Sequence, residues 1–203
     1  MNSYEREEQL IRAAVAGSRT EFAELLRSLE PEMRSRVRIA PLWRRSLSVD
    51  DVLQVSWLEA FLRIGSLRDA TPPGLRAWLI RIIDNNLRDA VRSLERDKRP
   101  DSRRRQTQGV AGESIRGLLQ RQASEQSGVS QPLQREEEFE HLRSAIQRLP
   151  KSYRLVIERM DIEERDVDEV AEELGRSRGA VHLLRSRARE RLRELLAKDE
   201  SGA

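Results

Sequence analysis

The arginine-rich segment near the end of the chain has residue types and spacing that suit anion binding rather than catalysis. Residues 176–193 contain seven arginines, whereas residues 161–173 contain eight acids and one arginine. Across the boundary of these blocks, Ala171, Gly175 and Val181 stand at spacings of four and six. A small residue, a turn glycine and an aliphatic residue at these spacings are typical of a helix-turn-helix, whose second helix Ser177 is placed to cap.

The second helix of this pair has a polar face that suits a DNA major groove. At 100° per residue, an apolar side meets the core through Val181, Leu184, Ala188, Leu192 and Leu195. We expect DNA contacts from Ser177, Arg178, His182, Leu183, Ser186 and Arg187, with Arg189 flanking them. Leu183 is expected to be exposed, either against a thymine methyl group or as a surface leucine. The acidic block should face away from DNA or meet another protein.

A second basic stripe runs along the segment LRAWLIRIIDNNLRDAVRSLERDKR. Leu79, Ile82, Ile83, Leu87, Ala90 and Leu94 form its apolar side. The expected DNA-binding residues are Arg76, Trp78, Arg81, Asn85, Arg88 and Arg92. Arginines can hold a phosphate backbone while an asparagine reads or holds a base. Trp78 lies at the edge between the two faces, where it could stack on an unpaired base or belong to the core.

The elements that position these residues are expected to be helices, giving an all-α chain of two small helical domains. One helix should end near Gly17, the next should be capped by Thr20 and end at Pro31, and another should begin after Ser48. A loop from Gly65 to Gly74 precedes a long helix over about residues 75–95. Composition then shifts to Arg, Gln, Ser and Gly. We therefore expect a domain over residues 1–96, a flexible linker over 97–133 and a second domain over 134–203.

Several classes of protein conflict with this composition. The chain has no cysteine, which excludes disulfides and thiol chemistry and suits a reducing cytosol. It lacks the phosphate-loop, zinc-protease, nucleophile-elbow and dinucleotide motifs, and its two histidines, His141 and His182, are far apart. No apolar run approaches the ~20 residues of a membrane span. We expect a cytoplasmic protein that is not an enzyme, with no metal, cofactor or small-molecule substrate.

Three segments, in order, resemble one family. DDVLQVSWLEAF resembles a region-two helix that docks on RNA polymerase, LRAWLIRIIDNNLRD resembles a segment that melts and reads the −10 element, and RLPKSYRLVIERMDIEERDVDEVAEELGRSRGAVHLLRSRARERL resembles region four. The chain is thus similar, over nearly its whole length, to sigma-70 family initiation factors of the small extracytoplasmic-function type. The resemblance implies that Asp50, Asp51, Gln54, Trp57 and Leu58 bind the polymerase clamp. It also implies that region four contacts the polymerase flap and the −35 element, with an anti-sigma factor as a candidate further partner.

The chain departs from the family pattern at three points. Val55 and Ser56 replace an acidic-aliphatic pair, and Leu183 with Leu184 replaces a polar-basic pair, so the −35 preference does not carry over. The prolines of TPPG lie in a loop that the family uses to capture a flipped −10 base. Two other hypotheses remain at this stage. The first is a stand-alone helix-turn-helix repressor or activator, and the second is a polymerase- or RNA-binding adaptor without sequence-specific contacts.

Overall fold

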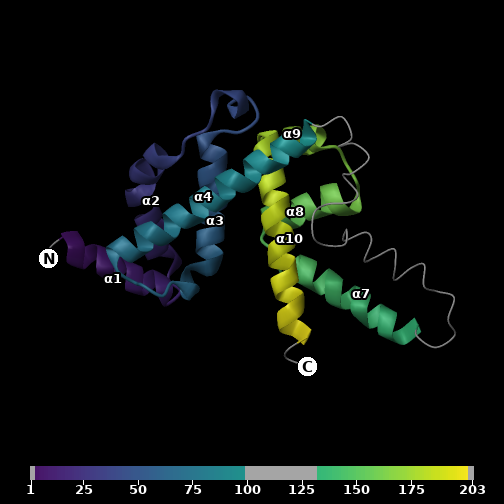
Figure 1. The fold of residues 1–203 in the computed structure, drawn as a ribbon. Coiled ribbons are helices and arrows are strands. Elements are labelled where there is room, and N and C mark those ends of the chain that lie inside the picture. Colours follow the sequence, from purple (N-terminus) through teal and green to yellow (C-terminus); the bar gives the residue numbers. More distant parts are fainter. Residues whose placement is uncertain (1–2, 99–131, 201–203) are drawn as a thin grey trace. The chain divides into compact units, whose positions relative to one another are not determined.

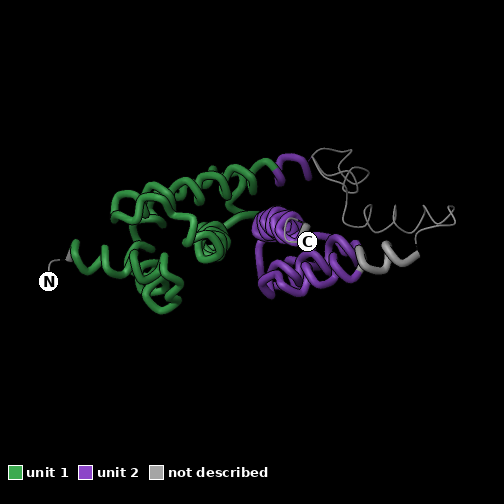
Figure 2. Tube along the Cα trace, turned by 90° about the horizontal axis from the view of Figure 1, so that it is seen from below, with its two compact units in different colours: residues 1–92 green, residues 93–203 purple. Residues whose placement is uncertain are grey.

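Helices form both parts of the chain in the computed structural model, which describes residues 3–98 and 132–200 (Figure 1). The described residues contain no strand, so the expected all-α class is confirmed. The chain divides into two compact units, Met1–Arg92 and Ser93–Ala203 (Figure 2). Apart from its ends, the linker expected over 97–133 lies outside the described residues. None of the helices in these two ranges combines the length and apolar character of a bilayer crossing.

The first unit is built from four helices and two short 3-10 turns. The elements are α1 (Ser3–Val15), α2 (Arg19–Arg36), η1 (Pro41–Trp43), α3 (Val49–Arg63), η2 (Ile64–Ser66) and α4 (Pro72–Asp97), whose last turns from Ser93 belong to the second unit. α2 packs against both α1 and α3. The core takes Ile11, Phe22, Leu25, Met33, Val52, Leu75, Leu79 and Ile83, each at most 2% exposed. Burial of these apolar side chains is the main force that holds the helices together.

Three helix boundaries in this unit differ from the sequence expectation. α2 begins at Arg19 after Ser18, so Thr20 is not its cap. α2 also continues through Pro31 to Arg36, although a proline removes one backbone hydrogen bond. The added turn carries Met33, which is fully buried one turn beyond Leu29, and its burial offsets the lost bond. Pro72 and Pro73 begin α4 rather than lying in the loop, because the first helical N–H groups need no partner within the helix.

The cap expected at Ser48 is confirmed. Its hydroxyl oxygen accepts the Asp51 N–H at 3.1 Å, and the Asp51 carboxylate accepts the Ser48 N–H at 3.3 Å. This reciprocal pair is a capping box, which satisfies two N–H groups at the start of the helix. α3 therefore begins at a fixed residue.

The second unit is built from four helices and one π-type turn in its described residues. Its elements are α7 (Pro132–Gln147), α8 (Lys151–Ile157), the π-type turn η3 (Glu158–Ile162), α9 (Val167–Leu174) and α10 (Arg178–Glu200). α10 packs against α7, α8 and α9. The core expected for α10 is confirmed, because Val181, Leu184, Ala188, Leu192 and Leu195 are all at most 6% exposed.

Candidate nucleic-acid interface

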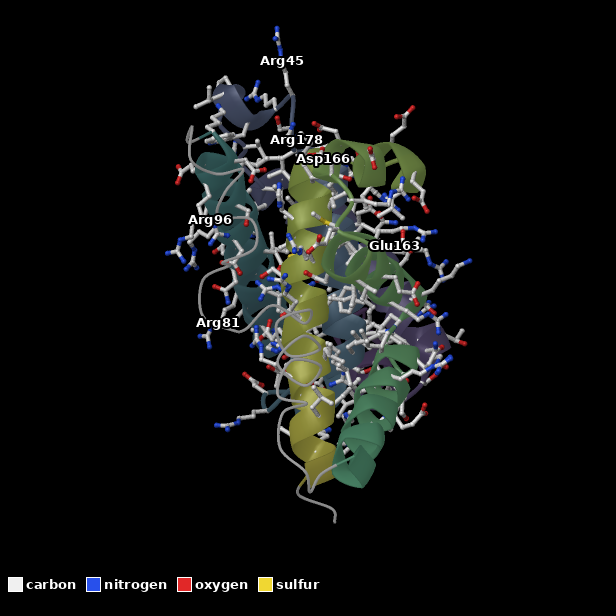
Figure 3. The ribbon with its side chains drawn as sticks, turned by 90° about the vertical axis from the view of Figure 1, so that its right-hand side faces the viewer. Arg45, Arg81, Arg96, Glu163, Asp166 and Arg178 are labelled. Atoms are coloured by element: carbon white, nitrogen blue, oxygen red, sulfur yellow. The ribbon has the colours of Figure 1, made fainter. Side chains whose placement is uncertain are left out.

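One side of α4 carries the exposed arginine stripe, here the set Arg81, Asn85, Arg88 and Arg92. The opposite side is buried through Leu79, Ile82, Ile83, Ala90 and Leu94. Within the described part of the chain Arg81, Arg88 and Arg92 form no ion pair, and the Arg81 side chain points away from the helices (Figure 3). Guanidinium groups that lack carboxylate partners remain able to bind phosphates.

The structure separates Arg76 from this stripe. Its guanidinium pairs with Glu7 of α1 at 2.6 Å and with Glu32 of α2 at 3.1 Å. The hydrogen bond to Glu7 is the largest factor that raises the pKa of Arg76 above its ordinary value. Arg76 and Arg88 are twelve residues apart, which places them about 120° apart around the helix. Arg76 therefore anchors α4 on α1 and α2, and its expected place among the DNA-facing residues is not supported by the geometry.

The loop before α4 is held tightly against the start of that helix. The Thr71 hydroxyl oxygen accepts the Gly74 N–H at 3.2 Å, while the hydroxyl group donates to Asp69 at 2.7 Å. A Cβ atom on Gly74 would collide with Asp69. Trp78, one turn further on, is half-buried, which leaves part of its ring accessible and part in the core.

An exposed stripe also runs along α3. Asp50 and Gln54 are exposed, and Trp57 and Leu58 are half-buried. Phe61 extends the same stripe at 37% exposure, with the Arg19 guanidinium 5.6 Å from its ring centroid. The site residues expected from sequence omitted Phe61, although its spacing from Gln54 and Trp57 is that of one helix face.

The adjacent acids Asp50 and Asp51 have different roles. Asp51 is 7% exposed, and its carboxylate belongs to the capping box. Asp50 is exposed, and it pairs with Arg34 at 2.6 Å. The geometry thus assigns Asp51 to the stability of the helix and leaves Asp50 accessible to a partner.

A buried polar cluster joins α3 to α4. Asn86 is fully buried, and its side-chain amide donates to the Ser56 hydroxyl oxygen and the Glu59 carboxylate, each at 3.0 Å. Glu59 is 6% exposed and also pairs with Arg63 at 3.1 Å. Buried polar groups are tolerated when their hydrogen bonds are made, and such bonds fix the positions of the groups. The cluster therefore fixes the register between the two helices.

The turn between α9 and α10 has the expected helix-turn-helix geometry. Gly175 adopts φ 60° and ψ 40°, the left-handed region that favours glycine. Ser177 accepts the Ala180 N–H on its hydroxyl oxygen at 3.2 Å, so the expected cap is confirmed. Along α10, Arg178, His182 and Ser186 then follow at intervals of four residues on one side. Arg178 pairs with Asp168 at 2.8 Å, and Arg187 with Glu190 at 2.8 Å.

Leu183 is not on an exposed face. Its side chain is fully buried, so the expectation of an exposed leucine against a thymine methyl group is wrong for this structure. Ala180 and Leu183 lie about one turn apart and are both buried, beside the expected core positions Val181 and Leu184. Four apolar residues within five positions make the start of α10 apolar around more than one stripe, and the hydrophobic effect favours burial of both.

Asp161 attaches α10 to the π-type turn. Its carboxylate has no exposed surface and accepts hydrogen bonds from Arg185 at 2.6 and 3.0 Å and from Arg189 at 3.2 Å. Arg189 was expected to flank the DNA-binding face, but the structure directs it to Asp161 instead. Sequence reasoning missed Asp161, whose only signal was an acid placed between the apolar residues Met160 and Ile162.

The acidic block is largely neutralised within the second unit. Glu173 pairs with Arg159 at 3.0 Å and also with Arg165, and Glu169 pairs with Arg165 at 3.3 Å. The hydrogen bond from Arg159 is the largest factor that lowers the pKa of Glu173. Glu163, which follows η3, pairs with Arg159, and the Asp166 carboxylate accepts the Asp168 N–H at 2.8 Å as the cap of α9. Most acids of the block thus have arginine partners within the second unit.

Comparison with known proteins identifies both units. The family model for sigma-70 region 2 matches residues 32–97, and that for sigma-70 region 4 matches residues 139–192. The chain is 28% identical over 189 residues to the ECF RNA polymerase sigma factor SigM of Mycobacterium tuberculosis, covering 93% of this chain and 83% of the relative. It is 26% identical over 192 residues to SigD of Mycobacterium bovis, an ECF RNA polymerase sigma factor, covering 94% and 84%.

A solved flagellar sigma/anti-sigma complex, Sigma-28/FlgM, aligns with 88% of this chain and 96% of that chain. The identity is 21% and the TM-score is 0.32.

Proposed function

The chain belongs to the sigma-70 family as an ECF sigma factor, and from this premise we propose how it divides promoter recognition between its units. Membership implies binding to RNA polymerase and promoter-specific initiation of transcription. The first unit takes the −10 element through α4, and the second unit takes the −35 element through α10. The domain boundaries near residues 96 and 134 follow from the same division, and both partners imply action in the cytoplasm.

The arginine stripe of α4 is the single observation that carries the −10 assignment. Arg81, Arg88 and Arg92 are exposed without ion pairs in the described residues, while most arginines of α1 to α3 have carboxylate partners. Unpaired guanidinium groups around Asn85 and the accessible edge of Trp78 suit a nucleic-acid strand, with phosphates on the arginines and a base against the ring. Opening the duplex costs unstacking energy, which such contacts offset.

The α3 stripe is the proposed contact to the polymerase clamp. It combines Asp50, Gln54, Trp57, Leu58 and Phe61, a mixture of one charge, one amide and accessible apolar surface. Such a surface is typical of a protein interface, because aromatic residues supply contact area and the polar groups give orientation. On α10, Arg178 and Ser186 are the residues proposed to face the −35 groove, whereas the expected contact His182 has a side chain that is only 10% exposed. An anti-sigma factor would compete for one of these surfaces.

Reconstitution with core polymerase tests this division. The chain should direct open-complex formation at defined sites on genomic DNA. Arg88→Ala combined with Arg92→Ala should weaken promoter opening and leave core binding intact. Arg12→Ala combined with Arg27→Ala removes the same charge from exposed positions of α1 and α2 and should leave both properties unchanged. Loss of core binding in the α4 variant, or specific promoter binding without polymerase, would refute the assignment.

A further inference from the structure

The segment between α2 and α3, residues 37–47, forms a basic projection that the proposed contacts leave unused. Between Glu32 and Asp50 the sequence has five arginines and no acid. Arg34 and Arg36 lie on α2 and pair with Glu30, Asp50 and Glu32. Arg38, Arg44 and Arg45 lie on the projection itself, and all three are exposed.

Buried apolar residues of the projection hold its backbone against the first unit. Val37, Ile39, Trp43 and Leu47 are buried, at 1–8% exposure. The Trp43 N–H donates to the Ala40 carbonyl and the Leu47 N–H to the Trp43 carbonyl, each at 2.9 Å. Because these apolar residues hold the backbone, the arginines between them point to solvent, as Arg45 does in Figure 3. Arginines on a backbone that is held in place bind an anion with less loss of conformational entropy than arginines on a free loop would.

Two of these arginines resemble the α4 stripe in lacking partners. Arg44 donates to the Ile39 carbonyl at 3.2 Å, whereas Arg38 and Arg45 form no ion pair with any described residue. Most arginines of α1 to α3 are paired. Arg19, Arg27 and Arg68 also lack a carboxylate partner among the described residues, but most of the guanidinium groups without one in this unit belong to the α4 stripe or to the projection. The shared property points to the same kind of ligand, a phosphate group.

Leu42 adds an apolar tip between the cations. It is 67% exposed, the most exposed large hydrophobic side chain in the described ranges. A nucleic-acid strand presents phosphates next to apolar sugar and base surface, which suits a leucine flanked by arginines. The neighbouring α3 stripe carries the acid Asp50, so its partner should be neutral or basic there. The surface that meets the projection should therefore differ in charge from the surface that meets α3.

We propose that the projection is a second phosphate contact of the first unit, in which Arg38 and Arg45 bind the backbone of promoter DNA and Leu42 packs on the strand. This inference rests on the proposed function, because it takes promoter DNA as the ligand. It adds a contact outside α4 that is independent of base sequence, since phosphate contacts position a protein without reading bases.

The salt dependence of promoter binding tests the inference in the full holoenzyme. The probe is a promoter that the wild-type holoenzyme selects from genomic DNA, and its Kd is measured over a range of KCl concentrations. The slope of log K against log salt is negative, and each lost phosphate contact reduces its magnitude by about 0.9. Arg38→Ala combined with Arg45→Ala should reduce the magnitude of the slope by about 1.8. The affinity for core polymerase in the absence of DNA should be unchanged. Leu42→Ser should weaken binding without changing the slope.

The control pair Arg12→Ala and Arg27→Ala should leave the slope at the wild-type value. An unchanged slope in the projection variant overturns the inference while the proposed function stands. Weaker core binding in that variant also overturns it, because the projection would then be a polymerase surface. A wild-type holoenzyme that selects no promoter overturns the proposed function and this inference together.

Discussion

Replacing Asp161 by alanine should lower the free energy of unfolding of the second unit and leave that of the first unit unchanged. The variant leaves Arg185 and Arg189 without the carboxylate they share, and their side chains are only 18% and 24% exposed. Removing one partner of a buried ion pair costs about 3–5 kcal/mol. Because both guanidinium groups retain some contact with water, we expect the lower end of that range, about 3 kcal/mol.

Amide hydrogen exchange of the full chain measures this loss in each unit separately. A fall of about 3 kcal/mol in the opening free energy speeds exchange by roughly 150-fold, since about 1.4 kcal/mol corresponds to a factor of ten. The acceleration should appear in α8, η3 and α10, while α1 to α3 exchange as before. Asp161→Asn keeps an oxygen acceptor and should lie between the alanine variant and the wild type.

The matched control is Glu163→Ala on the same turn. Glu163 is 41% exposed and pairs with Arg159 at the surface, so its loss should cost under about 1 kcal/mol. If Asp161→Ala changed exchange in α10 by no more than the control does, the idea that this carboxylate attaches α10 to its support would be wrong.

Three further predictions concern the turn, the acidic surface and the α3 cap. Gly175→Ala should destabilise the second unit by about 1–2 kcal/mol through its left-handed backbone alone, because a Cβ there meets no atom within 4 Å; thermal unfolding should show Gly175→Asn to be milder. The lowered pKa of Glu173 stabilises the fold at pH values above its ordinary pKa of 4.5. That stability should disappear as the pH falls through the lowered pKa, and Glu173→Gln should flatten this part of a stability–pH curve. Ser48→Ala should cost the first unit about 1 kcal/mol in denaturant unfolding, whereas Ser28→Ala at an exposed position of α2 should cost less.

Helical periodicity predicted most of what the two units bury. The apolar face of α10 and the cap at Ser48 follow from local pattern alone, because they depend on spacing within one helix. Pro31 was misread for a related reason. A proline usually ends a helix, and only the tertiary burial of Met33 shows why α2 continues through it.

The charged residues were harder to assign, because their partners come from other elements. Arg76 and Arg189 look like their neighbours in sequence, yet Glu7, Glu32 and Asp161 hold them half-buried at contacts between elements. A helical wheel gives the direction of a side chain without telling which other helix meets it. The two faces of the candidate site could therefore be predicted from the sequence. Which arginines belong to each face depended on ion pairs between elements.

The Asn86 cluster limits how this protein could be recombined with its relatives. A hybrid that combined α3 of this chain with an α4 lacking an amide at the position of Asn86 would place Glu59 in the interior without its amide donor. A hybrid with the opposite exchange would leave the Asn86 amide without the Ser56 and Glu59 oxygens. Polymerase docking and −10 recognition are thus proposed to reside on two helices that can be exchanged only as a pair.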